Sequence, residues 1–170
     1  MQERISRMNQ VVQAADGREG KYLTFTLAGE EYGIGILKIR EIIGMMPITS
    51  VPQAPDFVKG VINLRGKVIP VIDLRLRFGM PAMDYTERTC IIVVEIDLDD
   101  TTLNIGIVVD SVSEVLNISG NDIEDAPTFG TQLNTEYILG MAKIEGGVKI
   151  LLAIDKVLTA NEIGLLKKTA

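Results

Sequence analysis

The sequence predicts an all-β protein built from two small β-barrels of about five strands each. Two observations lead to this fold class: the chain contains about ten short segments typical of strands, and part of it occurs twice. The segment GVINLRGKV, which begins at Gly60, matches GMAKIEGGV, which begins 80 residues later at Gly140. Earlier segments that begin at Tyr32 and Ile105 match at an offset of 73 residues. A unit too short to bury its own apolar face usually packs against its copy, so we expect one shared core.

The composition is that of an ordinary globular domain. A chain of 170 residues buries roughly 70% of the surface that its unfolded form exposes, so it needs no disulfide or metal for stability. The apolar runs are only a few residues long, far below the roughly 20 that cross a bilayer, so we expect no membrane insertion. Charges in MQERISRMNQ occupy the place of a signal peptide's apolar segment. The expected compartment is therefore the cytoplasm.

The composition disfavours histidine-based catalysis, metal binding and nucleic-acid binding. Histidine is absent, which removes imidazole bases and most zinc and iron sites. The single cysteine, Cys90, lies in the apolar run CIIVVEI and is interpreted as a core residue. Asp97, Asp99 and Asp100 lack the spacing of an EF-hand, so we predict no metal and no cofactor. A formal net charge of −6 gives no overall attraction for nucleic acid, so none is expected as a partner.

The first third of the chain contains an extension and a hairpin. Residues 1–20 are interpreted as an N-terminal extension. From Lys21 onward, Leu23, Phe25 and Leu27 alternate with polar or amphipathic residues, and Gly29 follows at a turn, which predicts a hairpin over 21–36. The segment 37–43 fits either a helix or a strand, and we favour a short helical turn that leads into a strand.

Two further strand pairs follow. Prolines 47, 52 and 55 predict a loop or an edge strand. Segments 59–64 and 67–74 are strand-like and are separated by Asn63-Leu-Arg-Gly66, where asparagine and glycine accept a positive φ, so Arg65 is placed at a hairpin tip. Segments 89–97 and 102–110 form the next pair, around the aspartate-rich turn 97–100.

The last third contains a loop, a strand pair and a helix. After Val115 the periodicity is lost until Tyr137, which predicts a long surface loop. Strands are expected over 138–144 and 148–154. Thr159 and Glu162 have the spacing of a capping box, which predicts a C-terminal helix.

The residues favour a docking protein over an enzyme. Glu41 and Glu114 are related by the duplication, but their spacing does not show that they meet. Apolar residues occupy turn and loop positions where partner surfaces are common: Val51, Phe57, Val58 and Phe129. Two alternatives stay open on pattern alone. One is a barrel hydrolase that uses carboxylates such as Asp73 and Glu114, and the other is an oligonucleotide-binding barrel.

Four segments resemble the CheW-type coupling proteins of bacterial chemotaxis. They are FTLAGEEYGIGILKIREII, GVINLRGKVIPVIDLRLRFG, GIVVDSVSEVL and TEYILGMAKIEGGVKILLAIDKVL. The resemblance implies two SH3-like five-stranded barrels that share a core, with residues 21–170 as one CheW-like domain of two intertwined subdomains, a few short helices and a C-terminal helix. It also implies a non-enzymatic adaptor, recruited to membrane-associated receptor arrays, that links methyl-accepting chemotaxis receptors to the regulatory domain of the histidine kinase CheA.

The same resemblance implies two sets of binding residues. The receptor-binding set lies along a groove between the barrels and consists of Ile39, Glu41, Arg65, Val108 and Val112. The kinase-binding set consists of Val51, Phe57, Val58 and Phe129. No catalytic residue is implied.

Overall fold

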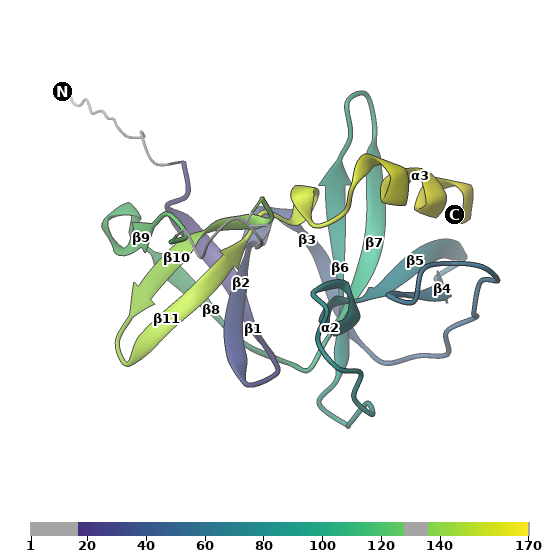
Figure 1. Cartoon of the computed structure of the whole chain (residues 1–170), viewed down its shortest axis with the longest axis horizontal. Coiled ribbons are helices and arrows are strands. Elements are labelled where there is room, and N and C mark those ends of the chain that lie inside the picture. Colours follow the sequence, from purple (N-terminus) through teal and green to yellow (C-terminus); the bar gives the residue numbers. More distant parts are fainter. Residues whose placement is uncertain (1–16, 128–135, 170) are drawn as a thin grey trace.

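The computed structural model describes residues 17–127 and 136–169, and Figure 1 shows that strands make up most of it. The strands are β1 (Gly20–Leu27), β2 (Glu30–Gly35), β3 (Ile39–Gly44), β4 (Val58–Leu64), β5 (Lys67–Asp73), β6 (Cys90–Asp97), β7 (Thr102–Val109), β8 (Ser111–Ile118), β9 (Ile123–Glu124), β10 (Ile138–Ile144) and β11 (Gly147–Leu152). The α-helices are α2 (Leu74–Arg77) and α3 (Ala160–Thr169), and three single 3₁₀ turns are η1 (Ile36–Lys38), η2 (Gly120–Asp122) and η3 (Ile154–Lys156).

Two sheets lie side by side, and each contains strands from both halves of the chain (Figure 1). The first has the order β8-β1-β2-β11-β10-β9, and the second has the order β3-β6-β7-β5-β4. The duplication relates the two sheets strand by strand, because β3, β6, β7, β5 and β4 match β8, β1, β2, β11 and β10. The joins between halves are also equivalent: β11 pairs with β2 in parallel, and β5 pairs with β7 in parallel.

The two hairpins related by the offset of 80 share an irregularity at the same place. The register between β4 and β5 shifts between Val58 and Gly60, and the register between β10 and β11 shifts between Ile138 and Gly140. A crossing segment approaches each glycine closely: a Cβ on Gly60 would lie 2.0 Å from the carbonyl oxygen of Thr49, and one on Gly140 would lie 3.1 Å from that of Glu124. The repeated glycines therefore mark places where backbone packs on backbone.

One large apolar core lies between the sheets, and each sheet also curves around a smaller one. The large core takes Leu23, Phe25 and Ile34 from the first sheet and Ile92 and Ile107 from the second. One smaller core includes Ile62, Val71 and Ile91, and the other includes Tyr22, Ala142 and Leu151. The shared core agrees with the expectation that neither unit buries its apolar face alone.

Most of the predicted elements are confirmed. The all-β class, the hairpins and the short helical turn before β3 are present. The backbone N–H of Glu162 donates to the hydroxyl of Thr159 at 3.2 Å, and the backbone N–H of Thr159 donates to the carboxylate of Glu162 at 2.8 Å, so the capping box at the start of α3 is confirmed. Cys90 is partly buried beside the large core.

The loop predicted after Val115 is wrong over its first nine residues, 116–124. Strand β8 continues to Ile118, and η2 and β9 follow, so the first sheet has six strands where five were expected. The isolated bridge between Thr49 and Val61 is the counterpart of β9 in the other half. Short pairings of one or two residues carry no periodicity, which is why the sequence did not reveal them. The strand expected over 67–74 ends at Asp73, which caps α2, and the one expected over 148–154 ends at Leu152.

Candidate partner-binding surface

Arg65 lies at the tip of the β4–β5 hairpin in an uncommon backbone conformation. Leu64 pairs with Lys67, and the two residues between them have positive φ values, 52° at Arg65 and 86° at Gly66. This combination defines a type I′ turn, whose twist matches that of the flanking strands. Asn63 does not adopt the positive φ that the sequence suggested; its side-chain oxygen accepts a hydrogen bond from the backbone N–H of Gly66 at 2.8 Å.

The Arg65 side chain forms an ion pair with Glu41, which comes from strand β3 at the opposite edge of the second sheet. The side chains of Arg65 and Glu41 are 68% and 30% exposed, so the pair faces solvent and contributes little to stability. The hydrogen bond with Glu41 raises the pKa of Arg65. A guanidinium group has five N–H donors, so Arg65 keeps donors for a carboxylate on a partner. The structure thus brings together two of the residues expected to bind the receptor.

The other three residues of that expected set differ in accessibility. Ile39 and Val112 are partly exposed and pack against the large core from β3 and β8. Val108 is only 3% exposed and belongs to the core of the second sheet. The expectation that Val108 forms a groove wall is therefore wrong for its side chain, because the residue faces inward from a central strand.

The expected kinase-binding residues also differ from one another. Phe57 is 9% exposed, and the guanidinium carbon of Arg77 lies 5.4 Å from the centre of its ring. The expected exposure of Phe57 is therefore wrong: the residue packs into the large core just before β4 begins. Val58 packs partly against the same core, and Val51 is partly exposed in the preceding loop. Phe129 lies outside the described residues.

Sequence reasoning missed most of the apolar side chains that are exposed. Leu37 is 94% exposed, Ile42 is 45% exposed, and Val68 and Val148 are 50% and 53% exposed. The repeat could have indicated two of these exposed positions, because Val68 and Val148 are equivalent and each follows a hairpin turn. Ile42 and Val115 are equivalent at the offset of 73, and Val115 is 50% exposed.

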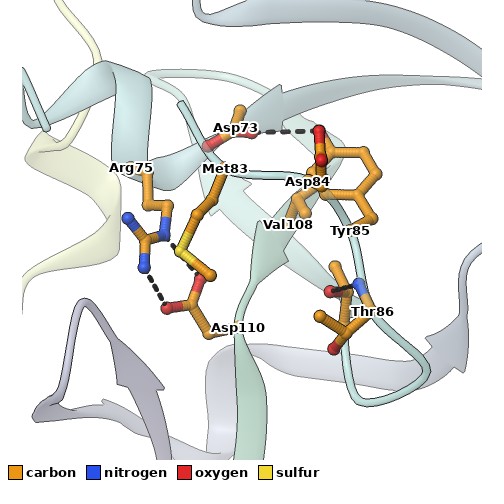
Figure 2. A pocket seen from close by; sticks show the side chains of 9 residues that line it. Asp73, Arg75, Met83, Asp84, Tyr85, Thr86, Val108 and Asp110 are labelled. Atoms are coloured by element: carbon orange, nitrogen blue, oxygen red, sulfur yellow. Dashed lines mark hydrogen bonds and ion pairs between the residues drawn. The ribbon is translucent and has the colours of Figure 1, made fainter. Parts of the chain in front are cut away.

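Three acidic residues, Asp73, Asp84 and Asp110, line a small polar cavity beside α2, and two of them, Asp73 and Asp110, are engaged in structural bonds (Figure 2). The cavity holds about 30 Å³. Asp73 accepts hydrogen bonds from the hydroxyl of Tyr85 at 2.9 Å and from the backbone N–H of Leu76 at 3.3 Å. Burial, with Asp73 beside it, raises the pKa of Tyr85. The phenol therefore stays neutral and holds the loop before β6 against α2.

The Asp110 carboxylate in Figure 2 belongs to an ion pair that joins three elements. Asp110 accepts hydrogen bonds from the Nε atom of Arg75 at 2.8 Å and from its terminal nitrogen at 2.7 Å. It also accepts one at 2.8 Å from the backbone N–H of Ala28 in the β1–β2 turn. The hydrogen bond from Arg75 lowers the pKa of Asp110, so the carboxylate is ionised and serves as a link between the sheets. Glu114, the other acid of the hydrolase alternative, lines a different cavity.

Comparison with known proteins identifies the family. The model of the CheW-like domain matches residues 21–162. The chain belongs to the CheW family. A chemotaxis protein CheW from Klebsiella aerogenes is 43% identical over 150 residues, which cover 88% of each chain. A chemotaxis protein CheW from Rhizobium meliloti is 36% identical over 86% of this chain and 90% of that protein.

A solved CheW structure has the same fold. The crystal structure of the scaffolding protein TtCheW from Thermoanaerobacter tengcongensis aligns with a TM-score of 0.74 at 38% identity, covering 85% of this chain and 95% of that one. CheW-family membership makes the present chain a scaffold-type protein of chemotaxis. Its described residues include no helix long and apolar enough to span a membrane, and no group of three or more side chains placed there to hold a metal ion.

Proposed function

We propose that this chain is a non-enzymatic adaptor that couples methyl-accepting chemotaxis receptors to the regulatory domain of the kinase CheA. The observation that carries the proposal is the ion pair of Glu41 with Arg65, which joins β3 to the tip of the β4–β5 hairpin and remains open to solvent. Membership of the CheW family supports the choice of partners. The adaptor acts at the cytoplasmic face of receptor arrays, to which its receptor contact recruits it.

The receptor-binding surface centres on Glu41 and Arg65, with the exposed edges of Ile39 and Val112 beside them. The kinase-binding surface lies around the loop before β4, where Val51 is the accessible residue and Val58 is partly accessible; Phe129 belongs to the same proposal. Each contact is small, so each is weak alone. Simultaneous binding to receptor and kinase in an array raises the total affinity through effective concentration.

Reversal of the charge at the hairpin tip tests the receptor surface. Arg65→Glu places a second carboxylate beside Glu41, and like charges at a contact weaken binding strongly. We expect at least tenfold less chain to co-sediment with receptor-containing membranes, while pull-down of the isolated CheA regulatory domain is unchanged. Lys143→Glu is the matched control, because Lys143 is also half exposed in an ion pair but lies on β10 in the first sheet.

A charge-swap variant separates two roles of Arg65. The double substitution Glu41→Arg with Arg65→Glu restores an ion pair of reversed direction. Recovery of receptor binding would show that the pair shapes the surface, whereas continued loss would show that the guanidinium contacts the receptor. Unchanged co-sedimentation for both the single and the double variant would contradict the proposed surface.

A further inference from the structure

Leu37 is far more exposed than any other large apolar side chain of the described residues. Its exposed fraction is 94%, while the other exposed large apolar side chains range from 40% to 53%. It is the middle residue of η1, the single 3₁₀ turn that connects β2 of the first sheet to β3 of the second. A single exposed leucine is common on protein surfaces, so its meaning depends on what holds it there.

The turn that carries Leu37 is fixed by polar contacts to both sheets. The Nζ atom of Lys38 lies 2.8 Å from a carboxylate oxygen of Asp97, at the end of β6, and 2.7 Å from one of Asp155, in the turn after β11. The second oxygen of Asp155 accepts a hydrogen bond from the backbone N–H of Asp97 at 3.0 Å. On the other side of Leu37, Ile36 packs against the large core. The backbone at Leu37 is therefore held in place while its side chain projects into solvent.

The internal repeat shows that packing does not require an apolar residue at this position. The offset of 73 matches Leu37 with Asp110, which lies between β7 and β8 just as Leu37 lies between β2 and β3. Asp110 accepts hydrogen bonds from Arg75 and from the backbone of Ala28. The same place in the scaffold thus accepts a charged, hydrogen-bonded side chain. Burial does not explain the leucine in the first unit.

We propose that Leu37 is an anchor of the receptor-binding surface and inserts into an apolar depression at the cytoplasmic tip of the receptor. The inference rests on the proposed function and extends its surface toward the N-terminus, because Leu37 precedes Ile39 and Glu41 by two and four residues in one continuous segment. Lys38 acts as a positioning residue. Since the turn is already ordered in the free protein, the contact requires little further ordering of backbone on binding.

Substitution of Leu37 tests the anchor directly. Burial of a whole leucine side chain corresponds to a change in affinity of about ten- to a hundredfold. In the full chain, Leu37→Ser is expected to weaken binding to receptor-containing membranes by that factor, measured by co-sedimentation over a range of concentrations. The urea midpoint stays unchanged because the side chain is 94% exposed, and the pull-down of the CheA regulatory domain stays unchanged because that contact lies elsewhere.

Two matched variants guard against indirect effects. Leu37→Met keeps an apolar side chain of similar volume and is expected to bind within about threefold of the original chain. Val148→Ser removes an apolar side chain that is 53% exposed, in β11 just after the hairpin turn, and is expected to leave receptor binding unchanged. Loss of binding in Leu37→Met, or an equal loss in Val148→Ser, would overturn the assignment of an anchor at this turn.

The positioning role of Lys38 has its own readout. Lys38→Met removes both ion pairs but keeps the aliphatic stem, so the turn loosens and receptor binding weakens less than in Leu37→Ser. The two effects are expected to be non-additive, because in the Leu37→Ser background there is no anchor left to position. Lys38→Arg retains the charge and is expected to restore binding. Additive losses would mean that Lys38 contacts the receptor itself, contrary to the proposal.

The outcomes separate this inference from the proposed function. If Arg65→Glu weakens receptor binding and Leu37→Ser leaves it within twofold, the inference is overturned and the proposed function stands. If Leu37→Ser weakens kinase pull-down instead, the inference is overturned as well. If the original chain does not co-sediment with receptor-containing membranes at all, the proposed function fails and the inference fails with it.

Discussion

At the scale of single residues, Asp110 joins three separate parts of the chain. Its carboxylate accepts hydrogen bonds from Arg75 after β5 and from Ala28 in the β1–β2 turn, while its backbone N–H donates to the carbonyl oxygen of Thr26 at 3.1 Å. The side chains of Arg75 and Asp110 are 11% and 26% exposed. Loss of one partner leaves a mostly buried charge without its counter-charge, which makes this pair costly to break.

We expect Asp110→Asn to lower the free energy of unfolding by about 1–3 kcal/mol. The loss arises because the variant removes the charge that Arg75 requires, and urea denaturation followed by circular dichroism measures it. Glu124→Gln serves as the control, since its ion pair with Lys143 joins side chains that are 62% and 55% exposed. The control is expected to change stability by less than about 0.5 kcal/mol, and an equal loss in both variants would contradict the special role of Asp110.

The effect of Asp110 depends on pH with a defined sign. Arg75 holds the pKa of this carboxylate below its ordinary value in the folded state, so the stabilisation is present above the unfolded pKa of about 3.9. It is lost as pH falls through the lower folded value. The difference in stability between the original chain and Asp110→Asn is therefore expected to be constant near neutral pH and to shrink below about pH 4. A difference that grows on acidification would contradict this assignment.

At the scale of elements, the sequence was sufficient for regular, repeated features and insufficient for accessibility. The β4–β5 and β10–β11 hairpins were predictable because glycines recur at the offset of 80 and apolar residues alternate between them. Strand β9 was not, because two residues have no measurable period. Phe57 and Val108 were expected at a surface but are buried. Their burial depends on the order of strands in the sheets and on packing between the sheets, and both are set by contacts between residues far apart in the sequence.

The glycine at the hairpin irregularity supplies a test at the level of the element. Gly60 has a φ of +141°, and a Cβ there would lie 2.0 Å from the carbonyl oxygen of Thr49, so Gly60→Ala forces β4 away from the preceding segment. We expect a loss of more than about 3 kcal/mol, beyond the usual cost of an unfavourable φ, measured by urea denaturation. Gly66→Ala, with φ +86° and open space around it, is expected to cost only about 1–3 kcal/mol. Equal losses would refute the steric explanation.

At the scale of the whole molecule, the two halves are interleaved. Each sheet needs strands from both, since β2 pairs with β11 and β5 pairs with β7. The large core likewise draws on both sheets. The duplication therefore produced one cooperative unit, in which the scaffold of each sheet is completed by the other half of the chain.

Separate expression of the halves tests this interdependence. Fragments 1–79 and 80–170 divide the chain between the two repeats, and each lacks partners for its central strands, so neither is expected to show a cooperative urea transition alone. Mixing the two is expected to restore dispersed amide signals in NMR spectra, because the missing parallel pairings can form between chains. A cooperative transition in either isolated fragment would contradict the interleaved fold.

The two copies of the repeat also differ at their hairpin turns. The two hairpins are equivalent in the repeat, but the turn position that holds Arg65 in one holds Glu145 in the other. The charge at this one turn position therefore has opposite signs in the two hairpins. Sequence differences at turn positions thus allow a partner to distinguish two parts of the molecule that have the same strand order.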